Sequence, residues 1–349
     1  MRTAASSRWP ASLTDRPVVL VRPRVEQVAC PLCRASDAAP LFDAVDRLHG
    51  TPGTFRYVRC GECGLGYQDP QVLAEDLHLL YPPGRYAPHR PPQTRAGPRR
   101  GPPGLMRFVR ETLALENVGD RVAAALPARA RWLDVGCGSG AYLLRLRERF
   151  GLETYGVDFS PAAAATARSA GLKVYQGSIH EAPFPEGSFD AVSAWWFLEH
   201  VPDPSPTLER MAALLRPGGT MLLAVPNLAS LNARLFRTRW YHLDCPRHLT
   251  LWTPATLARL HAQAGLHVER AFYDRASWGL AGSLRYSFRP SGRADSGSRL
   301  GVVARQALLP WTLATGLTRV ADTVAVKSYK PHASSGSGEN EHGRMDAAS

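Results

Sequence analysis

The fold of this chain is decided by one short stretch, Trp132-Leu133-Asp134-Val135-Gly136-Cys137-Gly138-Ser139-Gly140. An apolar run ends in an acid, and three glycines follow at every second position. Glycine has no Cβ and adopts positive φ without steric cost, so the pattern predicts a strand, a tight turn and the start of a helix. The free N–H groups at the start of such a helix favour a bound nucleotide.

A second strand with a terminal acid follows this turn. The run from Glu153 to Asp158 predicts that strand, and Asp158 stands where a carboxylate could bind a ribose diol. Ser160 and Pro161 then begin the next helix. A nicotinamide-binding fold uses a similar glycine loop, so the loop alone leaves both alternatives open.

These residues resemble the class I S-adenosylmethionine (SAM)-dependent methyltransferases, whose first motif is D-x-G-x-G-x-G and whose second strand ends in a ribose-binding acid. The resemblance continues in the same order through residues 185–192, 197–204 and 215–219. It implies SAM as cofactor and an α/β, Rossmann-like sheet of seven strands. The seventh strand of this family lies antiparallel between the fifth and the sixth.

The resemblance also implies a set of cofactor-binding residues in the loops that follow the first three strands. They are Asp134, Gly136, Cys137, Gly138, Gly140, Asp158, Phe159, Ser178 and Ile179. Many relatives carry an acid for the adenine amine after the third strand, whereas this chain has Gln176-Gly177-Ser178-Ile179 there. We therefore expect adenine recognition to depend on Ser178, on backbone groups and on stacking against Phe159.

Two C-x-x-C pairs precede this domain, Cys30 with Cys33 and Cys60 with Cys63. Four cysteines at this spacing predict a structural Zn²⁺ site, and a short β-rich segment buries too little core to fold unaided. Two disulfides or a redox dithiol are the alternatives, but no secretory signal precedes Cys30 and no βαβ pattern surrounds either pair. Cysteine fills all four positions, so we do not expect metal catalysis at this site.

Composition sets the class of protein. The chain has 349 residues, 44% of them hydrophobic, which suffices for one α/β domain and a small accessory module. The net charge of +12 suggests nucleic acid, but the arginines are scattered or concentrated in a proline-rich segment without acids, residues 82–104, so we expect no nucleic-acid partner. A basic face could still suit a nucleotide sugar. No apolar run reaches ~18 residues, so we expect a soluble, cytoplasmic protein without a membrane span.

The predicted organisation has five parts. They are a disordered arm (1–24), a zinc-ribbon module (25–70), a Pro/Arg-rich linker (71–104), the methyltransferase domain (105–330) and a disordered tail (331–349). The domain includes a lid after the fifth strand and an insertion at about 274–319. A helix is expected over 105–126, and strands are expected to begin at Ala130, Thr154, Lys173, Asp190 and Thr220, with two more over 266–273 and 322–330. Alternating strands and helices place a ligand at the carboxyl ends of a parallel sheet.

Methyl transfer to a hydroxyl or a carbon requires that the acceptor lose a proton, so a base is expected nearby. His200 is the first candidate, because it follows the fourth strand beside Glu199 and its pKa lies nearest neutrality. In similar sugar methyltransferases with a zinc module, an acid–histidine pair at this place lies at the substrate. The alternative is that His200 only braces its loop.

The segment 227–252 follows the fifth strand and is expected to cover the active site. Its W-x-x-x-D-x-P-R-H-L pattern resembles a bacterial methyltransferase subgroup found beside polysaccharide and natural-product genes. Trp240, Asp244 and Arg247 are candidate substrate residues, with Arg247 as a phosphate ligand, and His248 is the second candidate base. The alternative is an Arg–Asp brace with tryptophan packing. Cys137 and Cys245 are expected to be non-catalytic.

Tyr81 and Tyr86 complete the candidate substrate residues, reaching the site from the accessory module. The sequence therefore predicts a SAM-dependent methyltransferase that transfers a methyl group to a carbon or an oxygen of a small hydroxylated metabolite, with a sugar or nucleotide sugar expected. An RNA methyltransferase is one alternative, although the N-P-P-[YFW] motif of base methylation is replaced by Trp195-Trp196-Phe197. A non-catalytic SAM-binding scaffold is the other. The acceptor and the oligomeric state stay open.

Overall fold

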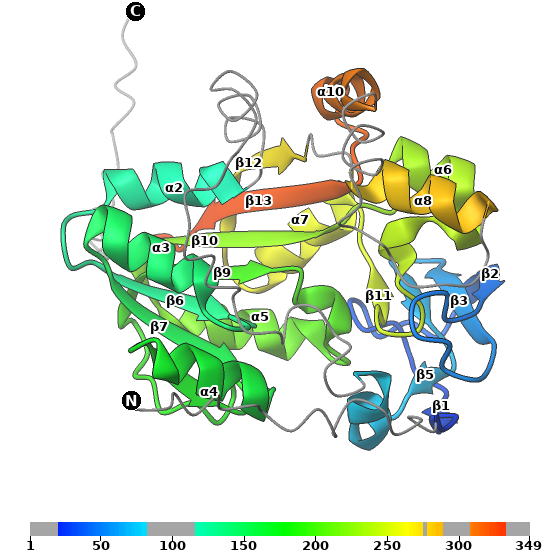
Figure 1. The fold of residues 1–349 in the computed structure, drawn as a ribbon, viewed down its shortest axis with the longest axis horizontal. Coiled ribbons are helices and arrows are strands. Elements are labelled where there is room, and N and C mark those ends of the chain that lie inside the picture. Colours follow the sequence, from blue (N-terminus) through cyan, green and yellow to red (C-terminus); the bar gives the residue numbers. More distant parts are fainter. Residues whose placement is uncertain (1–19, 82–115, 275–277, 289–307, 333–349) are drawn as a thin grey trace, which may run out of the picture.

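The structure is a computed structural model that describes residues 20–81, 116–274, 278–288 and 308–332. It comprises a seven-stranded sheet flanked by helices and an N-terminal module of short strands, which lies at the right of Figure 1.

The large sheet has the predicted fold class. Its strands run in the order β12-β13-β10-β9-β6-β7-β8. Strands β8, β7, β6, β9 and β10 are parallel, whereas β13 is antiparallel to both of its neighbours, β10 and β12. The last strand therefore lies between the fifth and the sixth, as predicted. The bounds are β6 Arg131–Val135, β7 Glu153–Asp158, β8 Lys173–Gln176, β9 Phe189–Trp195, β10 Leu215–Pro226, β12 His267–Tyr273 and β13 Thr323–Tyr329.

One strand departs from its expected start by more than one residue. We expected the fifth strand to begin at Thr220, but β10 begins at Leu215, which pairs with Phe189. The register of the pair shifts between Leu215 and Thr220. The Arg216-Pro217-Gly218-Gly219 turn is therefore an irregularity within the strand.

Helices cover both faces of this sheet (Figure 1). On one face lie α2 Glu116–Ala125, α3 Ala141–Phe150 and α4 Pro161–Ser169, and on the other lie α5 Pro204–Leu214 and α7 Pro254–Gln263. Successive side chains of β6 point to opposite faces of the sheet. Trp132 therefore packs with the first group of helices and Leu133 with the second. Of the helix expected over 105–126, the structure has α2, and residues 105–115 lie outside the described residues.

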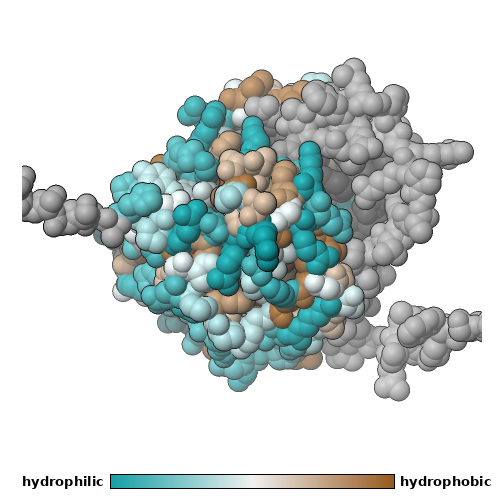
Figure 2. All heavy atoms as spheres, turned by 90° about the vertical axis from the view of Figure 1, so that its left-hand side faces the viewer, coloured by the Kyte–Doolittle hydropathy of each residue, from teal (hydrophilic) through white to brown (hydrophobic). Residues whose placement is uncertain are grey.

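The side of the molecule that is turned toward the reader in Figure 2 mixes hydrophilic residues with smaller hydrophobic spots. Among the described helices, none is long and apolar enough to cross a membrane.

The N-terminal module extends beyond its expected bounds of 25–70. Its elements are β1 Val25–Glu26, β2 Ala38–Ala44, β3 Phe55–Cys60, β4 Gly66–Gln68, β5 Gln71–Val72 and the 3₁₀ helix η1 Ala74–Leu80. Arg24 forms an ion pair with Asp76 of η1 at 2.7 Å. Residues 20–24 of the predicted arm and 71–81 of the predicted linker therefore belong to the module. The rest of the arm and linker, residues 1–19 and 82–104, lies outside the described part. Arg24 donates hydrogen bonds to Asp76 of η1, and the N–H of Leu73 donates to the carbonyl of Arg24. These bonds join η1 to the module.

The segment 227–252, expected as a lid, is joined to the module. It contains α6 Leu231–Phe236, the 3₁₀ helices η4 Arg237–Arg239 and η5 Tyr241–Leu243, and β11 Thr250–Leu251. Strand β11 pairs antiparallel with β4, so it completes a four-stranded sheet in the order β11-β4-β3-β2. The module and the methyltransferase domain are thus continuous through this sheet.

The two parts also share their cores. Leu65 and Tyr67 of the module pack in the same cluster as the α5 and α7 face of the large sheet. Tyr57 of β3 packs with Trp240 and Leu243 of the segment 227–252. Within the insertion expected at 274–319, the structure has α8 Trp278–Phe288 and α10 Leu309–Leu317, and residues 275–277 and 289–307 lie outside the described part.

Candidate functional site

The glycine loop between β6 and α3 has the predicted geometry. Gly136 has φ +76°, and a Cβ there would lie 2.7 Å from the ring of Phe197. Gly140 has φ +80° and caps α3, and a Cβ there would overlap Leu172. Both positions therefore require glycine, for the backbone conformation and for the close approach.

Two acids end the strands on either side of this loop. Asp158 accepts hydrogen bonds from the backbone N–H of Gly138 at 2.7 Å and of Ser160 at 2.8 Å, which fixes the loop against β7. Asp134 accepts from the hydroxyl of Ser193 on β9 at 2.6 Å. Burial raises the pKa of Asp134 to about 7, against the effect of the Ser193 hydrogen bond.

The remaining predicted cofactor residues surround the same loop. Phe159 follows β7 and is 70% exposed, so its ring is available for stacking. The Ser178 hydroxyl accepts from the backbone N–H of His180 at 3.2 Å. Ile179 is buried in the core, which leaves only its backbone to a ligand. The Cys137 thiol is buried against Gly156, as expected for packing, and burial raises its pKa.

The chain turns sharply where β9 ends. Trp196 has φ +52°, in the left-handed region that non-glycine residues seldom adopt, and the 3₁₀ helix η3 Leu198–His200 follows. Such strain concentrates at functional sites. The turn brings Phe197 against the cofactor loop and places Glu199 and His200 just beyond it.

Glu199 is 1% exposed, and neither of its carboxylate oxygens has a hydrogen-bond partner among the described residues. Burial raises its pKa to about 8, and the nearby charge of Asp244 acts in the same direction. A buried carboxyl that has no hydrogen-bond partner in the described part of the chain is costly, so Glu199 stays a candidate for a functional role at this sheet edge.

His200 is half-buried, and its Nδ1 lies 3.1 Å from the carbonyl oxygen of Arg247 and 3.0 Å from the Tyr81 hydroxyl. A carbonyl only accepts, so the hydrogen is on Nδ1 and the lone pair is on Nε2. Tyr81 directly follows η1, so the module contributes a side chain to this cluster. Tyr86 lies outside the described residues.

His248 is the second histidine of the cluster. Its ring centroid lies 4.7 Å from that of His200, and its Nδ1 donates to the carbonyl of His242 at 2.9 Å. The free Nε2 lies 3.9 Å from Oε1 of Glu199 and 3.9 Å from Oδ2 of Asp244. Burial lowers the pKa of His248 to about 3, and the charge of His200 adds to this shift, so the imidazole is neutral.

Arg247 is enclosed by two carboxylates, those of Asp46 and Asp244. Its side chain is 0% exposed, and it donates two parallel hydrogen bonds to Asp46 of the module, at 2.8 and 2.9 Å. It also donates to Oδ1 of Asp244 at 2.7 and 3.0 Å. The guanidinium counteracts the effect of burial and holds the pKa of Asp46 well below its usual value. These contacts form an Arg–Asp brace, which was the alternative, and they leave the guanidinium no exposed surface for a phosphate.

Trp240 is not a substrate face either. It is 2% exposed, and its indole N–H donates to Asp322 at 2.8 Å. Asp322 also accepts from Asn232 at 2.7 Å and from Ser230 at 3.2 Å, so it anchors the segment 227–252 to the start of β13. Sequence reasoning did not single out Asp322 or Asp46, because neither belongs to a motif.

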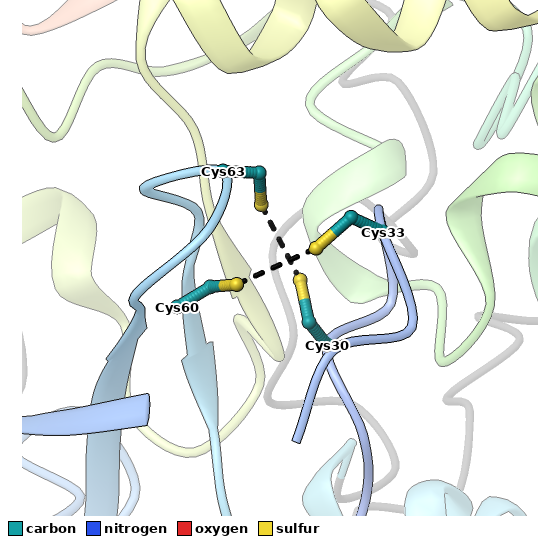
Figure 3. Close-up of side chains that lie close together, drawn as sticks. All are labelled: Cys30, Cys33, Cys60 and Cys63. Carbon is teal, nitrogen blue, oxygen red and sulfur yellow. Dashed lines mark hydrogen bonds between the residues drawn. The ribbon is translucent and has the colours of Figure 1, made fainter. Parts of the chain in front are cut away.

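The four cysteines converge on one point (Figure 3). Sulfur atoms lie 3.5 Å apart in Cys30 and Cys63 and 3.4 Å apart in Cys33 and Cys60, far longer than a disulfide bond. All four Sγ atoms lie within 4.8 Å of one another. Burial raises the pKa of the Cys63 thiol to about 11, whereas hydrogen bonds lower that of Cys60 to about 7. This donor set fits tetrahedral Zn²⁺.

Known proteins confirm the class of enzyme. A family model described as a methyltransferase domain matches residues 106–271. A ubiquinone biosynthesis O-methyltransferase from Xanthomonas axonopodis pv. citri is 35% identical over 173 residues, which cover 44% of this chain and 69% of that protein. The chain belongs to the SAM-dependent methyltransferases.

Two further similarities lie within this family of SAM-dependent methyltransferases. The 27-O-demethylrifamycin SV methyltransferase from Amycolatopsis mediterranei is 34% identical over 140 residues, covering 36% of this chain and 52% of that enzyme. The chain thus spans about half the length of this relative. A solved phosphoethanolamine N-methyltransferase 2 from Haemonchus contortus, in complex with SAM, has a TM-score of 0.45 and 17% identity and covers 64% of this chain and 56% of that one.

Proposed function

We propose that this methyltransferase transfers the methyl group of SAM to a hydroxyl of a small metabolite, at the cluster formed by Glu199, His200 and His248. The observation that carries the proposal is a buried carboxyl that has no hydrogen-bond partner among the described residues and lies beside two imidazoles, at the edge of the sheet where Phe197 meets the cofactor loop. The carboxyl ends of the parallel strands are the place where such folds bind ligands.

The cofactor is assigned to the loop that joins β6 to α3. Asp158 is oriented by Gly138 and Ser160, and its remaining lone pairs are proposed to accept from the ribose hydroxyls. Phe159 offers an exposed ring to the adenine, which agrees with the lack of an acid after β8. The sulfonium methyl would then face the end of β9.

The cluster can take a proton from the acceptor. His248 is neutral, and His200 has its Nε2 lone pair directed away from the bond of Nδ1. As the acceptor oxygen attacks, its O–H bond breaks and the proton passes to the cluster. The new O–CH₃ bond forms as the S–CH₃ bond of SAM breaks, and S-adenosylhomocysteine leaves. His200, the most exposed of the three side chains, is the first candidate base.

The acceptor is proposed to be uncharged at the reacting end. Among the described residues, Arg247 lies beside the cluster, and two carboxylates, Asp46 and Asp244, neutralise it. This favours a hydroxyl of a sugar or a phenol over a group carrying phosphate. The names of the two curated relatives describe O-methyltransferases, which favours oxygen over carbon as the methylated atom. A sugar hydroxyl is retained as the acceptor of first choice.

The four cysteines are proposed to hold a structural Zn²⁺. Cys30 and Cys33 lie in the loop after β1, Cys60 ends β3, and Cys63 lies in the turn between β3 and β4. The metal would fix β3 and β4, and β4 pairs with β11, which begins at Thr250, just beyond His248 and Leu249. The zinc thus acts on the shape of the acceptor site and takes no part in the chemistry.

The test is transfer of labelled methyl from SAM by the purified full chain to three acceptor panels: neutral sugars and nucleotide sugars, phenols, and RNA. We expect labelled methyl ethers in the first or the second panel, and at least a tenfold lower rate for His200→Ala with unchanged SAM affinity. Label in RNA alone, or equal rates in the variant, would overturn the proposal.

A further inference from the structure

The acid–histidine cluster has the chemistry of a cation site. One ligand atom each of Glu199, His200 and His248 lies within 4.8 Å of the others. Metal bonds of about 2.0–2.2 Å to nitrogen and oxygen require these atoms to approach further, which small side-chain rotations supply. Two imidazoles and a carboxylate suit a first-row divalent transition metal.

In each of the two histidines, Nδ1 is bonded to a backbone carbonyl, as is typical of histidines that bind metals. Nδ1 of His200 is bonded to the carbonyl of Arg247 at 3.1 Å, and Nδ1 of His248 is bonded to the carbonyl of His242 at 2.9 Å. A histidine ligand usually donates its second N–H to a carbonyl or a carboxylate, which fixes the tautomer and the ring orientation. Here the same bonds leave Nε2 of each ring with the lone pair.

The charges of the cluster also favour a cation. Three carboxylates lie within or beside it, Glu199, Asp244 and Asp46, and Arg247 neutralises only one equivalent. Oδ1 of Asp244 accepts from Arg247, whereas its Oδ2 faces Nε2 of His248. When a metal displaces the proton of Glu199, the three carboxylates exceed the charge of Arg247 by two, which one divalent cation balances. Glu199 is 1% exposed, neither of its oxygens has a hydrogen-bond partner within the described ranges, and its side chain is the one aimed into the site.

We infer that Glu199, His200 and His248 form a second metal site, distinct from the four cysteines, which binds a divalent transition metal next to the acceptor. Its role in the reaction rests on the proposed function. A hydroxyl that binds such a metal loses its proton more readily, so its O–H bond breaks to release the proton to water while the oxygen takes the methyl group from SAM. His200 then acts as a ligand and not as the base.

The test is binding of Co²⁺ to the full chain with zinc already in the cysteine site. We expect about one additional Co²⁺ per chain after desalting, with weak ligand-field absorption and without the intense charge-transfer band of a cobalt–thiolate bond. Glu199→Gln keeps the size of the side chain and should lower the Co²⁺ affinity at least tenfold. Glu181→Gln, a change of an exposed acid, should leave it unchanged.

Three results would overturn the inference: no Co²⁺ beyond the zinc, equal binding by Glu199→Gln, or a charge-transfer band that places the cobalt at the cysteines. SAM affinity and the melting temperature show whether Glu199→Gln is folded. Methyl transfer that persists without a second metal would leave the proposed function intact, with His200 as the base. Metal binding without transfer to any panel would instead remove the proposed function and keep the metal site.

Discussion

Asp134 and Asp158 end neighbouring strands, and the structure gives their carboxylates different partners. Asp158 accepts from backbone N–H groups of the cofactor loop, whereas Asp134 is buried and bonded to a side chain of β9. The first is proposed to bind the ribose of SAM, and the second joins β6 to β9. Two variants separate these roles.

Asp158→Ala should weaken SAM binding by about 10- to 100-fold, because hydrogen bonds to a charged group contribute roughly 1.5–3 kcal/mol. Isothermal titration calorimetry measures this affinity. Glu153→Ala, at the opposite end of β7, is the matched control and should bind SAM as the wild type does. Equal affinity in Asp158→Ala would remove this residue from the cofactor site.

Asp134 should make the stability of the cofactor-free protein depend on pH. Burial raises its pKa from 3.8 to about 7, so between these values the folded state holds a proton that the unfolded state releases. The free energy of unfolding should therefore fall as pH rises from about 4 to about 7. Asp134→Asn should show a weaker fall in urea unfolding. A slope identical to that of the wild type would contradict the raised pKa.

At this scale the sequence predicts contiguous motifs and misses distant partners. The glycine loop and each cysteine pair were predictable, because each is a motif of a few contiguous residues whose spacing fits one local geometry. The sequence predicted that Arg247 binds phosphate, because its actual partner, Asp46, lies 201 positions away and could not be recognised as a neighbour. The burial of the Arg247 side chain distinguishes an Arg–Asp brace from a phosphate ligand, and this burial depends on the fold.

At the scale of elements, the loop after β2 and the segment 227–252 are joined by the ion pair of Asp46 and Arg247. The pair is buried and bidentate, and the carbonyl of Arg247 is bonded to His200. Tyr57 of β3 donates to the carbonyl of His248 at 2.8 Å. The module therefore holds the backbone on which the candidate acceptor site is built.

Asp46→Ala should destabilise the protein by about 3–5 kcal/mol, because it leaves a buried guanidinium with only Asp244 as a partner. Arg34→Ala is the matched control, since Arg34 and Asp203 also join the module to the domain but are 60% and 48% exposed. Its loss should amount to about 1 kcal/mol or less. Chemical denaturation measures both, and equal losses would show that the buried pair has no special role.

At the scale of the whole molecule, the module and the methyltransferase domain form one body. They share the sheet β11-β4-β3-β2 and two hydrophobic clusters. The sequence predicted both parts from their own motifs. It could not predict the junction, because β11 is two residues long and its pairing with β4 arises only in the folded chain.

Removal of the proposed zinc from the cysteines should therefore loosen the structure around the acceptor site more than around the cofactor site. After chelation we expect faster amide hydrogen exchange in β4 and β11 and little change in β6 and β7. SAM affinity should be retained while turnover falls. A metal-free protein with unchanged exchange in β4 would contradict the structural role of the metal.

The account is tested most directly by one measurement: transfer of labelled methyl from SAM by the full chain into a cell extract that is then separated into small molecules, nucleic acid and protein. The account predicts label in the small-molecule fraction, resistant to nuclease and protease, with at least a tenfold loss in Glu199→Gln and in His200→Ala. Label in RNA or protein, or equal labelling by these variants, would contradict it.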